Sequence, residues 1–308
     1  MSASSSGDPC RTVHQPVLVR DVLRLLAVES GQTVVDGTVG AGGHSQSLLE
    51  QIGPGGVLIG LDRDPQMLVR AGAVLDAPNC HLIHAGYSRL RSVLDQLDVP
   101  HVDRILLDLG YSSDQLADEQ RGFRFNSDGP LDLRFDTSWG RPAYELLRTA
   151  AEEELERILR DFGEERHARK IAAEIVRRRR TQPVATARQL AELAAETVGG
   201  SRGRKHHPAT LVFQALRIAV NDELGLLETT LREVFPGVLA PGGRAAVISF
   251  HSLEDRLVKH AFRDKDQWEN LTAKPVTATA VERKINPRSR SAKLRVAIIK
   301  PPDAKEPT

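Results

Sequence analysis

The segment TVVDGTVGAGGH, residues 33–44, contains the clearest indication of the fold class. It begins as a short β-branched run that ends in Asp36 and continues as a glycine-rich turn from Gly37 to Gly43. Glycines let a backbone turn sharply and approach a ligand closely, and a helix that follows such a turn offers free N–H groups. Residues 45–52 have the apolar spacing of a helix. A strand, a glycine turn and a helix in this order predict a nucleotide-like ligand at the carboxyl edge of a sheet.

The same alternation of strand and helix continues along the chain. Short apolar runs predict strands at 33–36, 56–61, 81–84, 104–107, 244–250 and 293–299. Helical spacing is found at 17–28, 45–52, 65–75, 87–97, 143–180 and 187–198. Strands that alternate with helices in this way favour a parallel, doubly wound sheet, so the predicted fold class is α/β with a Rossmann-like core.

The alternation is interrupted in the middle of the chain. Residues 112–142 are polar and rich in loops, and helical sequence follows. Because neither half alone supplies a complete sheet, we expect one discontinuous core with an insertion. The expected parts are a core at 13–113 and 214–301, an inserted helical substrate-recognition domain at 114–213, a basic linker at 199–205, and disordered tails at 1–12 and 302–308.

Charge is unevenly distributed, although the formal net charge is only +1. From Gly163 to His207 there are eleven Lys and Arg against five Asp and Glu, and from Lys274 to Lys300 there are eight against one. Two such patches suggest a polyanionic partner, with a merely solvated surface as the alternative. The two cysteines form no disulfide framework, and no signal peptide or long apolar run is present, so we expect a cytoplasmic protein without a membrane span.

Acidic residues end the second and fourth predicted strands. Asp62 lies 22 residues after Gly40, where a carboxylate can accept hydrogen bonds from ribose hydroxyls. Asp108 could reach the same cofactor or a target amine. Enzymes that use NAD and enzymes that use S-adenosylmethionine share this arrangement. The other interpretation of each acid is a helix cap or a turn residue.

Several long motifs then identify a family. They are HQPVL, DGTVGAGGHS, LDRDP, LLDLGYSSDQLADEQRGFRF, GPLDLR, FGEERHARKIA, HPAT, FQALRIAVNDEL, LAPGGR, SFHSLEDRLVK and NPRSRSAKLR, between His14 and Arg295. With these motifs the chain resembles the bacterial RsmH family, also called MraW, the ribosomal RNA small subunit methyltransferase H enzymes. The resemblance covers nearly the whole chain.

The resemblance implies an S-adenosylmethionine-dependent methyltransferase with an inserted helical domain. It implies that the methyl acceptor is N4 of a cytidine in the decoding region of 16S rRNA, so the expected partner is that RNA or the small ribosomal subunit. It leaves open whether the protein forms a homodimer. The implied cofactor-binding residues are Gly42, Gly43, His44, Asp62, Tyr87, Asp108 and Gln115.

Residues on the substrate side are hypotheses from their place in the motifs. Asp108, or a nearby backbone carbonyl, would accept an amine hydrogen, Tyr111 would shape the base pocket, and His251 would face the substrate. For Tyr111 and His251 the alternative is ordinary packing. Ser252 and Asp255 stand near capping-box spacing, so we expect this pair to cap the helix that follows. The predicted contacts to RNA phosphate are Arg177, Arg178, Arg179, Arg180, Arg288 and Arg290. His206 and His207 lack cysteine partners, so we expect no metal site.

Three other functions use the same residues. An NAD-dependent dehydrogenase would leave the basic patches without a role, and its glycine fingerprint would be cleaner. A non-catalytic RNA-binding protein would not need the glycine turn and the strand-ending acids. A methyltransferase for DNA or a small molecule is the third alternative. The basic insertion disfavours a small substrate, and only the family resemblance selects RNA over DNA.

Overall fold

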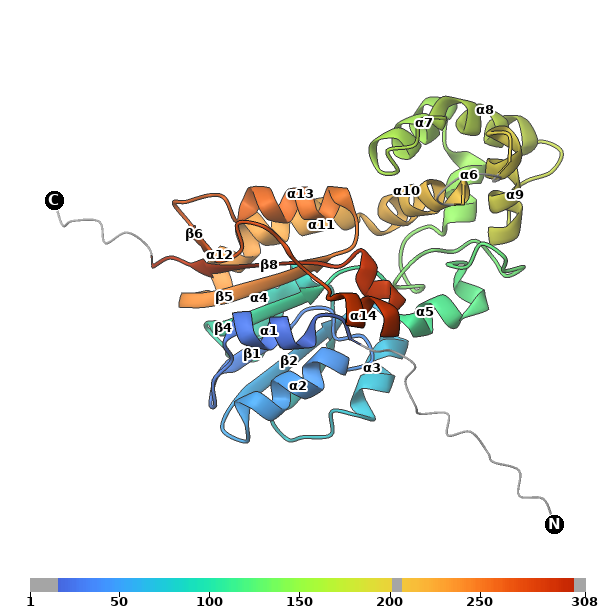
Figure 1. Cartoon of the computed structure of the whole chain (residues 1–308). Helices are drawn as coiled ribbons and strands as arrows, with labels where there is room; N and C mark the ends of the chain where they lie inside the picture. Colours follow the sequence, from blue (N-terminus) through green and yellow to red (C-terminus); the bar gives the residue numbers. More distant parts are fainter. Residues whose placement is uncertain (1–15, 201–206, 302–308) are drawn as a thin grey trace, which may run out of the picture. The chain divides into compact units, whose positions relative to one another are not determined.

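The computed structural model describes residues 16–200 and 207–301 (Figure 1). The predicted tails at 1–12 and 302–308 and most of the predicted linker at 199–205 lie outside the described residues. Within the described part the chain divides into two compact units: one holds the chain up to Gly110 and from Leu227 onward, and the other is Tyr111–Leu226.

The first unit is built on one mixed sheet. Its strands are β1 (Thr33–Asp36), β2 (Val57–Asp62), β3 (Cys80–His84), β4 (Val102–Asp108), β5 (Leu239–Ser249), β6 (Trp268–Asn270), β7 (Val276–Thr277) and β8 (Lys293–Ile299). The order is β3-β2-β1-β4-β5-β8-β6, and β7 also pairs with β8. β1 to β5 are mutually parallel, whereas β8 runs antiparallel to β5, β6 and β7. The predicted α/β class is therefore confirmed, with an antiparallel edge that the sequence did not reveal.

Helices cover both faces of this sheet (Figure 1). They are α1 (Val19–Leu26), α2 (Gly43–Ile52), α3 (Pro65–Gly72), α4 (Leu90–Gln96), α12 (Phe235–Val238), α13 (Ser252–Ala261) and α14 (Ala280–Ile285). The boundary between the two units falls inside α11 (Glu223–Thr229), after Leu226. Short helical turns lie at η1 (Tyr87–Arg89), η3 (Thr230–Val234, a π-helix) and η4 (Pro287–Arg290).

Alternation along the strands creates the two apolar layers. Val34, Leu58 and Leu106 pack with α1 and α2 in one cluster, while the adjacent Val35 and Ile59 belong to a second cluster with α4 and α13. Successive side chains of a strand point to opposite faces, so strands buried on both faces read as continuous apolar runs. That is why the strands were recognisable in the sequence.

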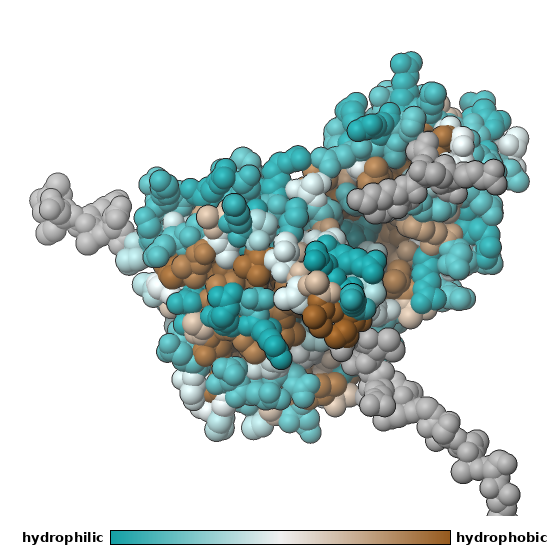
Figure 2. All heavy atoms as spheres, viewed as in Figure 1, coloured by the Kyte–Doolittle hydropathy of each residue, from teal (hydrophilic) through white to brown (hydrophobic). Residues whose placement is uncertain are grey.

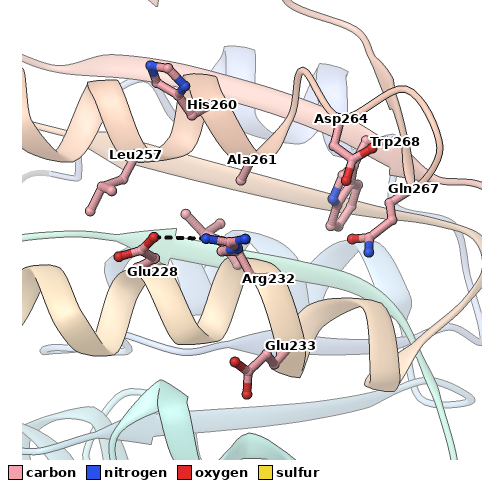
Figure 3. Close-up of a pocket in the computed structure, with 10 residues that line it drawn as sticks. Glu228, Arg232, Glu233, Leu257, His260, Ala261, Asp264, Gln267 and Trp268 are labelled. Carbon is pink, nitrogen blue, oxygen red and sulfur yellow. Dashed lines mark hydrogen bonds and ion pairs between the residues drawn. The ribbon is translucent and has the colours of Figure 1, made fainter.

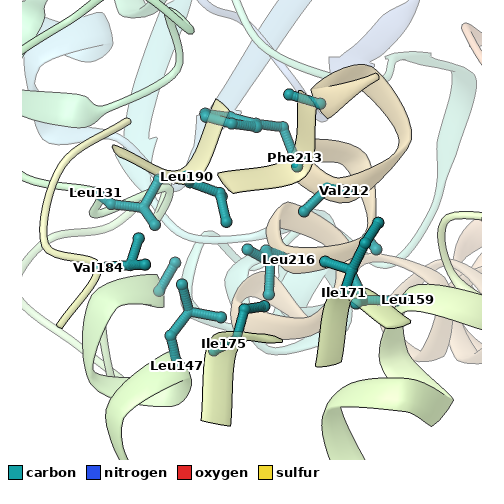
Figure 4. Packing of buried hydrophobic residues seen from close by; sticks show 14 of the residues in the cluster. Leu131, Leu147, Leu159, Ile171, Ile175, Val184, Leu190, Val212, Phe213 and Leu216 are labelled. Carbon is teal, nitrogen blue, oxygen red and sulfur yellow. The ribbon is translucent and has the colours of Figure 1, made fainter. Parts of the chain in front are cut away.

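The second unit is helical. It contains α5 (Ser113–Ala117), η2 (Glu119–Arg121), α6 (Ala143–Thr149), α7 (Glu152–Asp161), α8 (Ala168–Arg178), α9 (Ala187–Thr197) and α10 (Ala209–Asn221). Apolar side chains from α6 to α10, among them Leu147, Ile175 and Leu216, form its core (Figure 4). The range 143–180, predicted as helical, divides into α6, α7 and α8.

The limits of the two units differ from the domain boundaries expected from the sequence. The sequence placed the second boundary between residues 213 and 214, which falls inside α10, a continuous helix of the second unit. The first boundary lies between Gly110 and Tyr111, close to the expected position after residue 113. Substrate recognition by the inserted unit remains a prediction.

The surface view shows hydrophilic side chains over most of one face, with apolar patches between them (Figure 2). Among the helices of residues 16–200 and 207–301, none combines the length and the apolar character that a membrane crossing requires.

Candidate active site

Three carboxylates end neighbouring strands of the first unit. Asp36, Asp62 and Asp108 are the last residues of β1, β2 and β4, which lie in the order β2-β1-β4. Because these strands are parallel, their carboxyl ends meet at one edge of the sheet, where open α/β sheets bind their ligands. The structure thus brings the predicted Asp62 and Asp108 to the same edge and adds Asp36.

The glycine turn lies against these acids. The Gly40 amide donates to Asp62 Oδ2 at 2.8 Å, and the Asp64 amide donates to Asp62 Oδ1 at 2.8 Å. Gly42 has φ +91° and precedes α2 as its N-cap. A Cβ on Gly43 would lie 3.1 Å from Pro16, so a larger residue would push the chain aside. The turn therefore needs glycine for both its conformation and its close packing.

Asp36 holds the base of the turn. Ser45 Oγ donates to Asp36 Oδ2 at 2.7 Å, and the Thr38 amide donates to Asp36 Oδ1 at 3.2 Å. Burial raises the pKa of Asp36, although His44 and these hydrogen bonds act in the opposite direction. Asp36 is only 1% exposed, so it supports the turn from inside the fold, whereas Asp62 is partly accessible to a ligand.

His44 links the turn to Asp108 and to the start of α1. Its Nε2 lies 2.8 Å from the carbonyl oxygen of Val17, and its Nδ1 lies 3.5 Å from Asp108 Oδ2. A carbonyl oxygen only accepts hydrogen bonds, so Nε2 must carry a hydrogen. His44 therefore connects the start of α1, the glycine turn and the end of β4.

Asp108 is buried but keeps an oxygen available. Its own amide donates to Thr38 Oγ1 at 2.6 Å. Within the described part of the chain, Asp108 Oδ1 is buried without a hydrogen-bond partner. A buried acceptor without a partner is costly, and a ligand with a donor group would satisfy it. Together with the glycine cradle, this oxygen shows that the residues present fit a nucleoside-like cofactor.

Burial also tunes the acidity of the site. It raises the pKa of Asp62 to about 6, against hydrogen bonds from the Asp64 and Gly40 amides that lower it. It raises the pKa of Asp108 to about 6 as well, while the neighbouring His44 lowers it. Two acids with raised pKa values at one sheet edge are typical of a functional site.

The remaining predicted cofactor residues fall in different units. Tyr87 belongs to the first unit, in η1, and its Cβ would lie 3.1 Å from a Cβ placed on Gly37, so it flanks the glycine turn. Gln115 belongs to the second unit, where its side-chain oxygen accepts from the Ser112 amide at 2.8 Å and completes a capping box of α5. The cofactor role of Gln115 remains a prediction.

Tyr111 is packed within the second unit. Its ring stacks on Phe123 with centroids 5.3 Å apart, and the Arg217 guanidinium lies over it at 5.2 Å. Arg217 is itself held by two bonds to Glu223, at 2.8 and 2.9 Å. These contacts support the packing interpretation of Tyr111, and its predicted part in a base pocket is not tested by them.

His251 has a structural role that the sequence assigned to other residues. The expected capping pair was Ser252 and Asp255. Instead His251 is the N-cap of α13, and its Nδ1 accepts from the Glu254 amide at 3.4 Å while Glu254 Oε2 accepts from the His251 amide at 3.3 Å. Asp255 binds Arg295 Nε at 2.6 Å. Contact of His251 with a substrate stays a prediction.

The arginines at the end of α8 have partners inside their own unit. Arg177 and Arg178 both donate to Glu174, with Nε–O distances of 2.7 and 2.6 Å. Arg179 Nη2 donates to the Ala150 carbonyl at 2.8 Å. Arg180 is exposed. The Arg177 side chain is 68% exposed, and an ion pair with such an exposed partner contributes little free energy, so phosphate could compete for Arg177. The RNA contact of all four arginines remains a prediction.

The second pair of predicted RNA-binding arginines lies in η4 of the first unit. Arg290 is exposed. Arg288 is partly buried. Its positive charge lowers the pKa of Asp108, but the opposing effect of burial is larger, so the pKa is raised overall. Arg288 therefore acts electrostatically on the cofactor edge, a placement that the basic composition of residues 274–300 did not indicate.

A separate cavity of about 650 Å³ lies between η3 and α13 (Figure 3). Leu257, Ala261 and Trp268 contribute apolar surface, and an ion pair of 3.1 Å joins Glu228 to Arg232. None of its lining residues belongs to the predicted cofactor set. The strand-ending acids therefore define the candidate site, and this cavity does not.

Sequence reasoning missed two supporting residues of the site. The Thr38 hydroxyl accepts a hydrogen bond from the Asp108 amide, and the Ser45 hydroxyl donates one to Asp36. Both lie inside the glycine-rich motif, which was the available signal, but a hydroxyl in a turn does not reveal which distant strand it meets. Val17, the acceptor for His44, carried no such signal.

Comparisons with known proteins identify a family and close relatives in sequence. The sequence pattern of the MraW methylase family matches residues 11–300. The chain is 46% identical to the ribosomal RNA small subunit methyltransferase H of Rhodopirellula baltica, over 96% of this chain and 94% of that protein. It is 47% identical to the protein of the same name from Trichlorobacter lovleyi, over 92% and 97%.

Similarity to solved structures is weaker. A putative rRNA methylase from Clostridium thermocellum gives a TM-score of 0.42 at 14% identity, covering 94% of this chain and 100% of that one. The crystal structure titled PH0851 gives a TM-score of 0.46 at 12% identity, covering 92% of this chain and 45% of that one.

Proposed function

Because this chain belongs to the MraW methylase family, and is therefore a methyltransferase that uses S-adenosylmethionine, we propose that it methylates N4 of a cytidine in 16S rRNA. The cytidine is number 1402 in the conventional numbering, in the decoding region. The curated relatives are named as small-subunit ribosomal RNA methyltransferases, which supports the choice of RNA as the substrate.

The observation that carries this proposal is the constellation at the carboxyl edge of the sheet. Asp62 is aimed from the end of β2, the glycine turn is held by Asp36, and Asp108 keeps a buried oxygen for a donor. In this proposal the Asp62 carboxylate accepts hydrogen bonds from the ribose hydroxyls of the cofactor. The turn lets the backbone approach the rest of the nucleoside.

When bound, S-adenosylmethionine supplies an activated methyl group on a sulfonium. In the transfer, the methyl carbon would exchange its bond to sulfur for a bond to N4, the sulfur would keep the electron pair, and N4 would release a proton. For an in-line displacement of this kind the main task of a protein is to position the reactants and exclude water.

Asp108 is the candidate acceptor for a hydrogen of the amine. The lone pair of the cytosine amine is conjugated with the ring, and hydrogen bonds from its two hydrogens favour a pyramidal, more nucleophilic nitrogen. Asp108 Oδ1 can accept one of these hydrogens or one from the cofactor, while Oδ2 is oriented by His44. Orientation by His44 would keep the free oxygen pointing to the ligand.

Substrate form, location and assembly belong to the same proposal. We place the activity in the cytoplasm, where the small ribosomal subunit is assembled, and take either the free RNA or that subunit as the substrate. The family resemblance also permits a homodimer, which sedimentation of the purified protein at several concentrations would test.

The test of function is transfer of a labelled methyl group. Purified protein is incubated with radiolabelled S-adenosylmethionine and with small subunits that lack their own methylation, followed by nucleoside analysis. Label in N4-methylcytidine is the expected result. Label in another nucleoside would show that the methyl acceptor is a different atom. If the protein binds the cofactor but transfers no label, the proposed function is rejected.

A further inference from the structure

Trp139 is an exposed aromatic side chain in the second unit. It is 70% exposed, and among the exposed large hydrophobic residues of the described part it is the one aromatic. The chain is poor in aromatics, at 4% of its residues. A large apolar ring left in water on a protein of this composition suggests a surface that is covered by a partner.

The turn that contains Trp139 is stabilised by hydrogen bonds from Arg134. Arg134 Nη1 donates to the carbonyl oxygens of Trp139 and Gly140, at 3.3 and 3.0 Å. The same guanidinium is fixed by Asp132, with Nε–Oδ1 of 2.7 Å and Nη2–Oδ2 of 2.8 Å. Gly140 has φ +77°, a left-handed conformation that suits glycine. The indole is thus presented on an ordered turn, which lowers the entropy cost of using it in binding.

The local charges suit a nucleic acid. Arg141 follows the turn and is exposed. The nearest carboxylate before Trp139 in the chain, Asp136, accepts from the amide and hydroxyl of Ser138 at 2.9 and 2.6 Å. A flat ring stacks on any base, and an adjacent cation can meet the phosphate. We propose that Trp139 stacks on an unpaired base of the RNA substrate.

This inference rests on the proposed function, since it takes RNA as the substrate. It adds a specific contact that is independent of the cofactor edge. Its test uses the fluorescence of the protein itself, because the chain has two tryptophans and the other, Trp268, is 2% exposed and packs on Phe262. Stacking on a base quenches indole emission, so Trp139 reports its own contact.

The probe is an unmethylated, in vitro transcribed 16S rRNA fragment that spans the decoding region. It is titrated into the full-length protein, and affinity is measured in parallel by filter binding. We expect quenching in the wild type that disappears in Trp139→Phe. Trp139→Ala should weaken binding by about 5- to 150-fold, and Trp139→Phe should retain most of the affinity because its ring still stacks. Val69→Ala, which trims another exposed apolar side chain, is the matched control and should change nothing.

Equal RNA affinity for the wild type and Trp139→Ala, with unchanged emission, would overturn the inference. So would a change in Trp139 emission that depends on protein concentration without RNA, because the ring would then serve self-association. Failure of the proposed function is distinguishable: neither the wild type nor any variant would then bind the RNA or methylate the small subunit.

Discussion

The chemistry of the site depends on a few residues whose contacts are fixed. His44 donates through Nε2 to the Val17 carbonyl, and its Nδ1 lies 3.5 Å from Asp108 Oδ2. Thr38 accepts the amide of Asp108 and thereby ties the glycine turn to the end of β4. The site is therefore a set of linked hydrogen bonds, and changes at one residue should be felt at its neighbours.

Cofactor affinity should depend on pH. Burial raises the pKa of Asp62 and of Asp108 to about 6, so each carboxyl is partly protonated near that pH. The sulfonium of the cofactor is positively charged and favours the ionised acids, so binding lowers both pKa values. Affinity should consequently rise between about pH 5 and pH 7 and level off above. Calorimetric titrations with S-adenosylmethionine across this range measure it.

The control is Asp108→Asn, which keeps the shape and removes one titrating group. Its pH profile should be shallower than that of the wild type, with Asp62 responsible for what remains. A wild-type affinity that does not change over this range would contradict the assignment of the two acids to the cofactor.

Thr38 should be needed for its hydroxyl. In Thr38→Val the shape is retained but the amide of Asp108 loses its acceptor, and a buried donor without a partner costs about 1–3 kcal/mol. Thr38→Ser keeps the acceptor and serves as the matched variant. Urea denaturation should show a lower free energy of unfolding for the valine variant, whereas equal values for both would show that water replaces the hydroxyl.

At the scale of single residues, the sequence predicted side chains whose position follows from a short local motif. Asp62 and Asp108 were found because each ends an apolar run. The contact between His44 and Val17 could not be found, since it joins a turn to a helix start that is 27 residues away. The predicted N-cap of α13 was wrong for a similar reason. Both His251 and Ser252 suit an N-cap position, and only the backbone conformation decides between them.

At the scale of elements, buried strands were the most predictable part. The bounds of β1 and β8 agree with the predicted 33–36 and 293–299. Helices were found where an apolar stripe existed, but their ends depend on tertiary contacts. Gly163 illustrates this: a Cβ there would lie 2.7 Å from the carbonyl oxygens of Leu159 and Leu211. The close approach of α10 therefore requires glycine after α7, which a periodic pattern cannot reveal.

Gly163→Ala should destabilise the second unit. The added methyl meets backbone oxygens of two segments, and neither can move without shifting its helix. Overpacking of this kind costs about 1–3 kcal/mol. Thermal denaturation should show a lower melting temperature. Gly55→Ala is the control, because a Cβ at Gly55 meets nothing within 4 Å, and a comparable loss in both variants would refute the packing argument.

At the scale of the whole molecule, the chain contains two cores. Leu147, Ile175 and Leu216 belong to a cluster made only of residues from the second unit, whereas the sheet clusters draw only on the first. The sequence predicted the interruption because sheet-like patterns stop and resume. The second predicted boundary falls inside α10, because the apolar spacing of a helix does not indicate which of the two cores the helix packs into.

Two cores should produce two unfolding transitions, and each unit carries one tryptophan as a reporter. Trp268 lies in the first unit and Trp139 in the second, so Trp139→Phe leaves a signal from the first unit and Trp268→Phe leaves one from the second. The strand-ending acids and the glycine turn lie in the first unit, so S-adenosylmethionine at 100 times its Kd should stabilise that unit by about 2.7 kcal/mol. The transition seen through Trp268 should move to higher temperature, and the one seen through Trp139 should move less. Identical shifts in both would mean that the units unfold as one, and the insertion would then be part of a single cooperative structure.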